Sequence, residues 1–310
     1  MARFRSNHSS PGSKGIPFLF KIVIYGVILI VFLLKLLKFF KAYELKQREM
    51  PVIESTKTIP INNKVGTTGI DLPNQSTQAI LVKHQYFTLS YSEPNEQAEW
   101  VSYTLTRDQL NLPKVGRFDY FSPDYSIKTK SALHRDYTGS GYTRGHLAPA
   151  ADMAFDQKAE EECFFMSNIS PQDKYFNQGI WRELEESIRD WARQYKSLII
   201  VTGPVLSQGI IKKIGENRVS VPSYFYKVVL DTLSEHQKGV GFIIKNSISD
   251  QPLETYMVTI DSVETLTKLD FFNAINKNQK IEKTEHDFNK TDWPFRSDRF
   301  HKRVEGWNKN

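Results

Sequence analysis

One stretch near the start of the chain limits the folds open to it more than any other. Residues 16–40 are almost entirely apolar, and their centre, Ile22–Leu34, carries no charge. A helix needs roughly 20 apolar residues to cross a bilayer, and Phe18–Leu37 has that length if Lys21 and Lys35 reach the two interfaces. We therefore expect one membrane-spanning helix over residues 16–40.

Three other interpretations of this stretch fit less well. A cleavable signal peptide needs a site of small residues, whereas residues 35–41 read KLLKFFK. An amphipathic surface helix needs a polar face, which the stretch lacks, and a buried core helix would not be so uniformly apolar beside a basic tail. Basic residues flank the stretch on both sides, so the positive-inside rule does not fix its orientation.

The formal net charge of +6 does not by itself indicate nucleic-acid binding. Six of the 41 Lys and Arg residues, and none of the 35 Asp and Glu residues, lie in residues 1–40. The remainder of the chain is therefore neutral overall, and a phosphate-binding surface must come from local clusters of basic residues. The single cysteine, Cys163, excludes an intrachain disulfide and a multi-cysteine metal site.

Changes in composition divide the chain into five parts. The expected parts are a disordered basic N-terminus (1–15), a transmembrane anchor (16–40), a polar spacer (41–84), a folded domain (85–273) and a charged C-terminal tail (274–310). The spacer is polar and contains several prolines. Trp293 and Trp307 are the candidates for docking the tail onto the domain.

Alternation of apolar residues predicts strands, and a period of 3.6 residues predicts helices. The expected strands are Tyr86–Tyr91, Glu99–Thr106, Ser197–Thr202, Ser223–Asp231 and Val240–Lys245. One helix is expected through Ile180, Leu184, Ile188, Trp191 and Tyr195, and a last one near Ser262–Lys268. Strands and helices mixed in this order indicate an α+β domain, and no internal repeat is visible.

A glycine-rich segment carries the first residues suited to chemistry. Gly139–Met153 reads GSGYTRGHLAPAADM, and its glycines and proline allow the backbone to turn sharply and present Arg144 and His146. A neutral imidazole can take a proton from water near neutral pH. A guanidinium group can bind two phosphate oxygens at once. This pair therefore suits the hydrolysis of a phosphate ester.

A second segment supplies candidate metal-binding groups. Ser167–Glu186 reads SNISPQDKYFNQGIWRELEE. On an ideal helix Asn177, Glu185 and Arg189 lie along one flank, away from the apolar stripe. Mg²⁺ takes oxygen ligands and keeps most of its waters, so one protein ligand can suffice. Without a thiol nucleophile or a carboxylate pair, the two segments indicate metal-assisted hydrolysis of a phosphate ester.

The two segments resemble the signature of the DNA/RNA non-specific endonuclease family. Its hallmark is Asp-Arg-Gly-His followed by an apolar and several small residues, then Ser-Asn-Ile-x-Pro-Gln and Asn-Gln-Gly-x-Trp-x-x-Leu-Glu. The matching stretches here are Thr143–Ala151 (TRGHLAPAA), Ser167–Gln172 and Asn177–Glu185. Tyr226–Asp231 and Asp261–Phe272 also resemble family landmarks, so the similarity covers about residues 85–273.

The resemblance implies both a fold and a metal site. The fold is an α+β domain with a central antiparallel sheet and an embedded ββα-metal (His-Me finger) core. The resemblance implies that His146 is the general base and that Asn177 is the direct ligand of Mg²⁺, with Mn²⁺ as an alternative ion. Glu185 would orient the waters bound to the metal.

The resemblance also implies the residues that bind the scissile phosphate. Arg144 and Arg189 would bind it and offset developing charge, and Arg117, in the stretch RFDYFSPD, resembles an upstream phosphate-binding arginine of the family. Asn168 would position the site near the base. A water activated by His146 would attack in line and leave 5′-phosphate and 3′-hydroxyl ends.

One position departs from the family pattern. The Asp that opens the family's hallmark is Thr143 in this chain. That carboxylate is thought to support the water shell of the metal, and a hydroxyl can form hydrogen bonds but adds no charge. We therefore expect weaker metal binding, with activity retained because the base, the ligand and the arginines are all present.

The resemblance implies DNA and RNA as partners, bound through the backbone without base specificity. Because some relatives are homodimers, it also admits a homodimer here. Lys128, Lys130, His134 and Arg135 form either a basic lip for the nucleic-acid backbone or a solvated surface. A nuclease that faces the genome would be lethal, so we expect the domain outside the cytoplasm, in the periplasm or on the outer face.

Two other functions stay open at this point. One is a catalytically silent nucleic-acid receptor, in which Thr143 marks the loss of activity. The other is a metal-dependent phosphodiesterase for small substrates, which would share the chemistry but would need a closed pocket instead of an open groove. Digestion of a plasmid with and without Mg²⁺ separates these alternatives.

Overall fold

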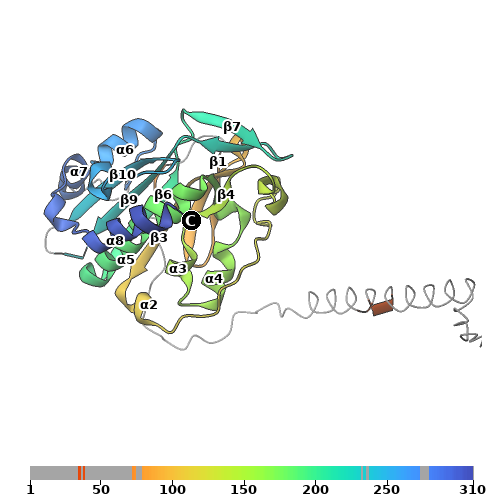
Figure 1. Ribbon diagram of the computed structural model, residues 1–310, viewed down its shortest axis with the longest axis horizontal. Coiled ribbons are helices and arrows are strands. Elements are labelled where there is room, and N and C mark those ends of the chain that lie inside the picture. The colour runs from red at the N-terminus through yellow and green to blue at the C-terminus, as the bar shows by residue number, and fades with distance from the viewer. Residues whose placement is uncertain are drawn as a thin grey trace, which may run out of the picture. The chain divides into compact units, whose positions relative to one another are not determined.

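The structure is a computed structural model (Figure 1) that describes most of the chain from residue 72 onward. The described residues are 34, 35, 38, 72–74, 79–231, 233–234, 237–272 and 279–309. The chain divides into two units, Met1–Asn63 and Lys64–Asn310. The expected membrane anchor lies outside the described residues except for Leu34, Lys35 and Lys38, which are helical. Among the residues described, no helix has both the length and the apolar character needed to cross a membrane.

A seven-stranded sheet forms the centre of the second unit. Its order is β1-β2-β3-β6-β9-β10-β11, and every neighbouring pair is antiparallel. The strands are β1 (Ala79–Lys83), β2 (Phe87–Ser92), β3 (Gln97–Thr106), β6 (Ser197–Pro204), β9 (Tyr224–Asp231), β10 (Lys238–Lys245) and β11 (Met257–Val258). The predicted mixed α+β fold with a central antiparallel sheet is confirmed.

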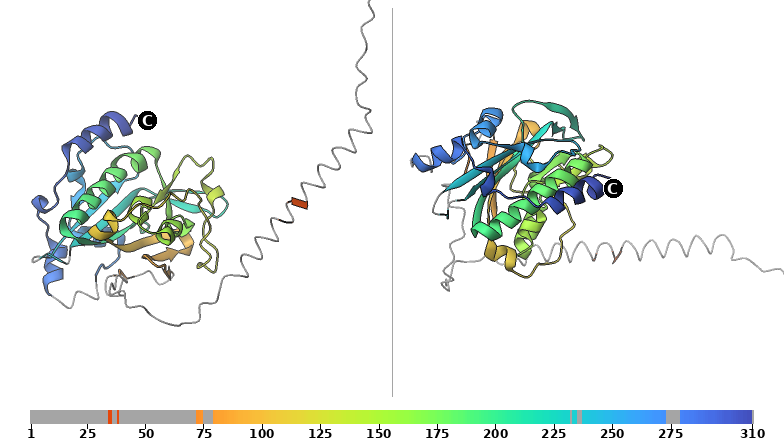
Figure 2. Two further views of the ribbon diagram at one scale, coloured as in Figure 1. Left: turned by 90° about the horizontal axis from the view of Figure 1, so that it is seen from below. Right: turned by 60° about the vertical axis from the view of Figure 1, so that its left-hand side comes forward.

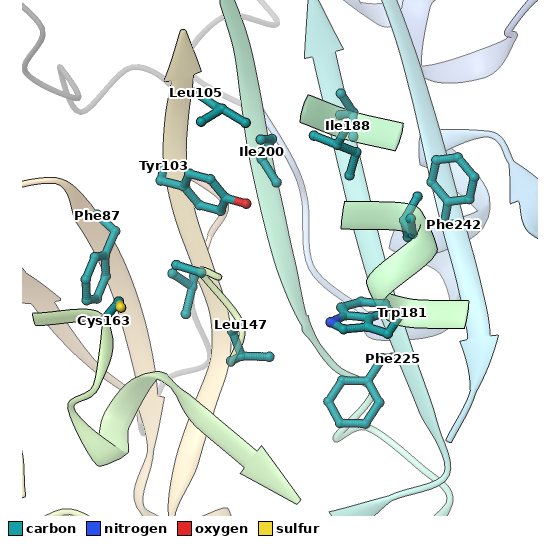
Figure 3. Close-up of a cluster of buried hydrophobic side chains, with 14 of the residues drawn as sticks. Phe87, Tyr103, Leu105, Leu147, Cys163, Trp181, Ile188, Ile200, Phe225 and Phe242 are labelled. Carbon is teal, nitrogen blue, oxygen red and sulfur yellow. The ribbon is translucent and has the colours of Figure 1, made fainter. Parts of the chain in front are cut away.

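Helices cover both faces of this sheet, because its strands are apolar on both faces. In β6, Leu198 and Ile200 pack into one core, whereas Ile199 and Val201 pack into the other. This alternation follows from the period of two in a strand. Helix α5 (Arg182–Tyr195) lies over the first face, where Figure 3 shows Ile188 above the strands. Helix α6 (Ile260–Thr267) covers the second face.

A separate two-stranded sheet carries the first motif and leads into the helix of the second motif. Strands β4 (Thr143–His146) and β5 (Ile169–Gln172) pair antiparallel, with Thr143 opposite Gln172 and His146 opposite Ile169. The short helices α3 (Ala150–Met153) and α4 (Gln157–Cys163) lie between these strands in sequence. After β5 comes the π-helical segment η4 (Phe176–Trp181), which continues directly into α5.

The folded unit begins earlier than the expected boundary at residue 85. Strand β1 pairs with β2 along its whole length, and the backbone of Asn74 donates to the carbonyl of Asp270 at 3.0 Å. The indole of Trp100 donates to the carbonyl of Asn74 at 2.9 Å. The last part of the expected spacer is therefore part of the domain.

The expected C-terminal tail is also folded. Residues 279–309, called the C-terminal segment below, contain α7 (Gln279–His286), η6 (Lys290–Asp292), α8 (Ser297–Lys302) and η7 (Arg303–Trp307). Trp293 is fully buried beside Trp191 of α5, which confirms that it docks. Figures 1 and 2 show the end of the chain beside α5. The charged composition concealed this packing, because most of the charged side chains in the segment face outward.

The remaining elements are short. They are η1 (Glu93–Asn95), α2 (Arg107–Asn111), η2 (His134–Tyr137), η3 (Met166–Asn168), β7 (Ile210–Ile214), β8 (Val219–Pro222) and η5 (Leu253–Tyr256). Strands β7 and β8 form a hairpin that was not expected. Its inner residues Ile214, Val219 and Val221 pack on Ile169 of β5, so the hairpin supports the small sheet.

Candidate active site

Two phenylalanine rings support the candidate base. His146 lies edge-on to Phe164 at 4.7 Å between ring centroids and 5.5 Å from the ring of Phe121. The guanidinium of Arg144 lies over Phe121 at 5.6 Å. Because residues two apart in a strand share a face, Arg144 and His146 both lie on the side of this phenylalanine pair. The structure therefore brings these two predicted residues together.

Arg117 reaches the same place from a distant part of the sequence. Its guanidinium lies over the other ring of the pair, Phe164, at 5.2 Å. The side chain is 58% exposed and forms an ion pair with Asp119. An exposed cation near a base can meet an anionic ligand that approaches from solvent. The structure thus places Arg117 with Arg144 and His146, as the sequence predicted.

The surroundings of His146 favour the neutral imidazole. Burial lowers the pKa of His146 to about 3, and the positive charge of Arg117 acts in the same direction, against a smaller opposing effect of Asp119. Its Nε2 atom is buried and has no hydrogen-bond partner among the described residues. A neutral imidazole with an unused nitrogen can exchange a proton with a ligand.

Gly145, between Arg144 and His146, is required by a close approach. A Cβ atom at this position would lie 2.0 Å from Oε1 and 2.1 Å from Cδ of Gln172. The side chain of Gln172, which is fully buried, crosses β4 directly over the glycine. A larger residue here would have to displace the buried side chain of Gln172, so this close approach favours glycine between Arg144 and His146.

The helix that carries Asn177 is not the ideal helix expected from the sequence. Asp173 begins it, because its carboxylate accepts the backbone N–H groups of Tyr175 and Phe176 at 2.9 and 3.1 Å. Residues 176–181 then form a π-helical segment, and Gly179 has non-helical angles of φ −102° and ψ −107°. The expected flank shared by Asn177 and Glu185 rested on an ideal helix, and the helix instead changes its pitch between them.

A hydrogen bond links the helix that carries Asn177 to strand β4. The amide Nδ2 of Asn177 donates to Oγ1 of Thr143 at 2.9 Å. The same hydroxyl donates to the backbone carbonyl of Gln172 at 2.9 Å. Thr143 is three residues before His146, about 10 Å along a strand, and its side chain belongs to the opposite face of β4. The hydrogen bond therefore attaches the Asn177 helix to the start of the strand that carries His146.

Arg189 of α5 is held by a contact with α3. Its guanidinium donates to Asp152 of α3 at 2.8 Å, and Asp152 also accepts the hydroxyl of Tyr103 at 2.8 Å. Arg189 is only 14% exposed, so most of its charge lies next to this carboxylate. Asp152 was not predicted as a site residue, although it lies within the glycine-rich segment.

Glu185 is influenced by a buried lysine that the sequence analysis did not single out. Burial raises the pKa of Glu185, while the positive charges of Lys227 and Arg189 lower it in part. Lys227 of β9 is fully buried, and its Nζ lies 4.6 Å from the ring centroid of Trp181. Within the described part of the chain, no atom accepts a hydrogen bond from this Nζ. The sequence signal that could have identified this residue is a lysine in the middle of an otherwise apolar strand.

Asn168 is a structural link rather than a contact for a ligand. Its side chain is fully buried. Oδ1 accepts the N–H of Ala148 at 2.9 Å, and Nδ2 donates to the carbonyls of Ala148 and Cys163 at 2.9 and 2.7 Å. These bonds fix the chain immediately after His146. The geometry agrees with a positioning role.

The donor set fits a hard divalent cation held by few protein ligands. Among the described residues, no group of three or more His, Cys, Asp or Glu side chains lies close enough to hold a metal. The Nδ2 of Asn177 is engaged by Thr143, which turns the amide oxygen away from that bond. An amide oxygen is a ligand that Mg²⁺ accepts.

The expected basic lip is exposed, and one of its four residues is paired with an acidic side chain. Lys128, Lys130, His134 and Arg135 are all exposed. Arg135 is paired with Glu216 of the β7–β8 turn at 3.1 Å, and the ring of His134 lies 6.1 Å from Phe121. Only His134 in this group is therefore placed next to the phenylalanine pair by a described contact.

The fold and the site together define a class of protein. The protein is an α+β protein with a central antiparallel sheet and a small two-stranded sheet that carries Arg144 and His146. The helix that follows the small sheet carries an amide, a carboxylate and a guanidinium group. Residues 65–278 match the DNA/RNA non-specific endonuclease family, and the chain belongs to this family.

Several known nucleases are similar to this chain. Human mitochondrial nuclease EXOG is 34% identical over 209 residues, covering 62% of this chain and 57% of that protein. Human mitochondrial endonuclease G is 32% identical over 206 residues, covering 62% and 69%, and a nuclease of Nostoc sp. is 31% identical over 242 residues, covering 74% and 86%. The chain thus spans little more than half of the length of EXOG.

A solved structure supports the fold at the same level of identity. The crystal structure of the EndoG/EndoGI complex contains a chain that is 32% identical to this one, with a TM-score of 0.59. The likeness covers 64% of this chain and 87% of that chain. The similarity therefore extends over most of that chain and leaves part of this one unmatched.

Proposed function

We propose that this chain is a Mg²⁺-dependent endonuclease that cuts DNA and RNA without base specificity and leaves 5′-phosphate and 3′-hydroxyl ends. Mn²⁺ would serve in place of Mg²⁺. The observation that carries the proposal is the hydrogen bond of 2.9 Å between Asn177 and Thr143, because it joins the Arg-Gly-His strand to the asparagine helix. Family membership supports the same conclusion.

His146 is the general base in this proposal. Its imidazole is neutral at physiological pH and takes a proton from the attacking water. The pKa of about 3 applies to the site with Arg117 nearby and no substrate. A phosphate that binds between the arginines adds negative charge, which opposes the effect of Arg117 and strengthens the base. The base thus gains proton affinity when the substrate is in place.

The metal would be held through Asn177. The strands β4 and β5 with the following helix would form the ββα-metal core, in which the amide oxygen of Asn177 is the one direct protein ligand. Bound there, Mg²⁺ would stabilise charge on the phosphate and on the departing 3′ oxygen. Glu185, whose ionised form is favoured by the nearby charges of Lys227 and Arg189, would orient the metal's waters by accepting their hydrogen bonds.

The three arginines would bind the scissile phosphate in different ways. Arg117 and Arg144 lie over the phenylalanine pair and would turn N–H groups toward phosphate oxygens, Arg117 in addition to its ion pair with the exposed Asp119. Arg189 is already bound to Asp152, so it would offer only its remaining N–H groups and would act mainly through its charge. Asn168 would hold the backbone after His146 in place.

We also propose that residues 16–40 anchor the chain in a membrane and that the nuclease domain lies outside the cytoplasm. The uncharged run Ile22–Leu34 supports the anchor, and the toxicity of a nuclease facing the genome supports the placement. Limited proteolysis of cells stripped of any outer membrane and wall, with the inner membrane intact, tests the topology. Digestion of the domain without lysis is expected, and protection until lysis would contradict it.

Plasmid digestion by the full-length chain in detergent tests the activity. Supercoiled DNA should become nicked with Mg²⁺ and stay intact with EDTA, and His146→Ala should remain inactive with Mg²⁺. Unchanged DNA that is still bound would indicate a silent receptor instead. Intact plasmid together with hydrolysis of a small phosphodiester would indicate a phosphodiesterase for small substrates.

A further inference from the structure

Thr143 stands where the family pattern has an acidic residue, and its hydroxyl takes part in two hydrogen bonds. It donates its single proton to the backbone carbonyl of Gln172 at 2.9 Å. It accepts a proton from Nδ2 of Asn177, also at 2.9 Å. The backbone positions of the first bond are fixed, because Thr143 and Gln172 are paired residues of β4 and β5.

This arrangement decides which end of the Asn177 amide faces Thr143. A carbonyl oxygen can only accept hydrogen bonds, so the Gln172 carbonyl requires the hydroxyl proton of Thr143. The hydroxyl oxygen can then act only as an acceptor toward Asn177. If the amide were turned over, its Oδ1 would face Oγ1 with no proton between them. The amide therefore presents its NH₂ group to Thr143 and its oxygen to the other side.

We propose that Thr143 is a positioning residue that orients the Asn177 amide oxygen toward the divalent ion, an inference that rests on the proposed function. A carboxylate at this position would also accept the NH₂ group and would add a negative charge. Thr143 gives the same orientation without charge, because the strand pair directs its proton away from Asn177. The departure from the family pattern thus keeps the geometry of the metal ligand and reduces only the charge around it.

Substitutions at Thr143 separate the hydroxyl from the shape of the side chain. Thr143→Val keeps the shape and removes the hydroxyl, and Thr143→Ala removes the hydroxyl with less bulk. Thr143→Ser keeps the hydroxyl. Loss of a group that orients a metal ligand typically weakens binding 10- to 100-fold. We expect Val and Ala to weaken Mn²⁺ binding roughly tenfold, and Ser to stay within about threefold of the parent.

Mn²⁺ binding by the full-length chain in detergent is measured from the electron paramagnetic resonance signal of the free ion. This readout does not depend on cleavage. Plasmid nicking as a function of Mg²⁺ concentration gives a second readout: Thr143→Val should need more Mg²⁺ for half-maximal rate and should regain most of its rate at saturation. Thermal unfolding of each variant shows whether it is folded. If Thr143→Val is not folded, Thr143→Ala takes its place in the comparison.

Comparison with Asn177→Ala separates failure of this proposal from failure of the proposed function. If Thr143 acts through Asn177, the double variant Thr143→Val/Asn177→Ala binds Mn²⁺ no more weakly than Asn177→Ala alone. Weakened binding in Asn177→Ala with parental binding in folded Thr143→Val would overturn the role of Thr143 alone. Parental Mn²⁺ binding by folded Asn177→Ala would overturn the assignment of Asn177 as the metal ligand, and the proposed function with it.

Discussion

At the scale of single residues, His146 shows how packing sets protonation. Its ring touches two phenylalanine rings and lies near the charge of Arg117, and burial lowers its pKa to about 3. We predict that the imidazole stays neutral from pH 8 down to about pH 4. Nuclear magnetic resonance of labelled histidine, with His146→Ala to assign the signal, would detect this. Titration near pH 6.5 would contradict it.

The same shift has a defined effect on stability. Above an ordinary histidine pKa near 6.5, the folded and unfolded chains both carry a neutral imidazole, so His146 adds no pH dependence. Below that value the unfolded chain takes up a proton that the folded chain does not. Stability attributable to His146 therefore falls as the pH is lowered from about 6.5 to about 3, by at most roughly 1.4 kcal/mol per pH unit.

Removing the base tests the catalytic assignment. We predict that His146→Ala lowers the rate of Mg²⁺-dependent plasmid nicking by roughly 10²- to 10⁴-fold, because general-base catalysis contributes that much. The melting temperature should change little, since only a partly buried ring is lost. The exposed His301→Ala provides the control and should cleave at the parental rate. Parental activity of His146→Ala would refute its role as base.

The buried Lys227 affects the ionisation of Glu185. Its charge, buried under Trp181, lowers the pKa of Glu185 against the effect of burial. We predict that Lys227→Met raises the pKa of Glu185 further, so that a smaller fraction is ionised at pH 7. Activity at pH 7 should fall roughly tenfold, as expected for loss of a group that supports metal-bound waters, and should recover in part at pH 9.

The pH profile distinguishes this effect from simple damage to the fold. The acid limb of the rate should move to higher pH in Lys227→Met, whereas a structural defect would lower the rate equally at every pH. Lys245→Met, which removes an exposed lysine from β10, should leave the profile unchanged. An unshifted acid limb in folded Lys227→Met would contradict the coupling.

At the scale of elements, five strands of the central sheet and helix α5 were predictable, and the π-helical segment before α5 was not. Alternating apolar residues gave β2 and β3, and apolar, β-branched runs gave β6, β9 and β10, all close to their true limits, because these patterns are local. The π-helical segment with Gly179 was not predicted, since its pitch depends on contacts from elsewhere: a Cβ on Gly179 would lie 2.6 Å from Oδ1 of Asn308. Lys227 was not predicted for the same reason, because Trp181, which lies over it, belongs to the π-helical segment and not to its own strand.

The β4–β5 pair gives a prediction at this scale. Gly145→Ala places a methyl group 2.0 Å from Oε1 of the buried Gln172, and overpacking of this kind typically costs about 1–3 kcal/mol. We predict that Gly145→Ala lowers both the melting temperature and the cleavage rate. Gln172→Ala should restore much of the stability in the double variant, because the Gln172 amide makes no side-chain hydrogen bond to the described residues. Additive losses in chemical denaturation would contradict the clash.

At the scale of the whole molecule, the domain extends beyond what its sequence pattern and its family indicate. The family match ends at residue 278, yet the C-terminal segment packs on α5. Arg299 pairs with Glu186 and Asp190 of α5 at 3.1 and 2.9 Å. A polar, charged sequence was read as a tail because each contact is made by a single side chain to a distant partner, and such contacts leave no periodic pattern.

Arg303 is the more deeply buried of the two arginines that join the C-terminal segment to α5. It is fully buried and donates to the carboxylate of Glu183 on α5 and to the carbonyls of Ser249 and Gln251. A buried carboxylate that loses its partner is strongly destabilising, by about 3–5 kcal/mol. Because Glu183 lies two residues from Glu185, loosening this contact would also disturb the helix that carries the proposed metal-supporting carboxylate.

We therefore predict that Arg303→Met destabilises the domain by about 3–5 kcal/mol and lowers nicking activity. Lys302→Met, a change to the exposed neighbouring residue, should shift stability by no more than about 0.5 kcal/mol. Adding Glu183→Leu to Arg303→Met removes the unpaired charge and should recover part of the stability in urea denaturation. If Arg303→Met unfolds at the parental urea concentration, the C-terminal segment does not support the site, and the domain that the family defines is sufficient by itself.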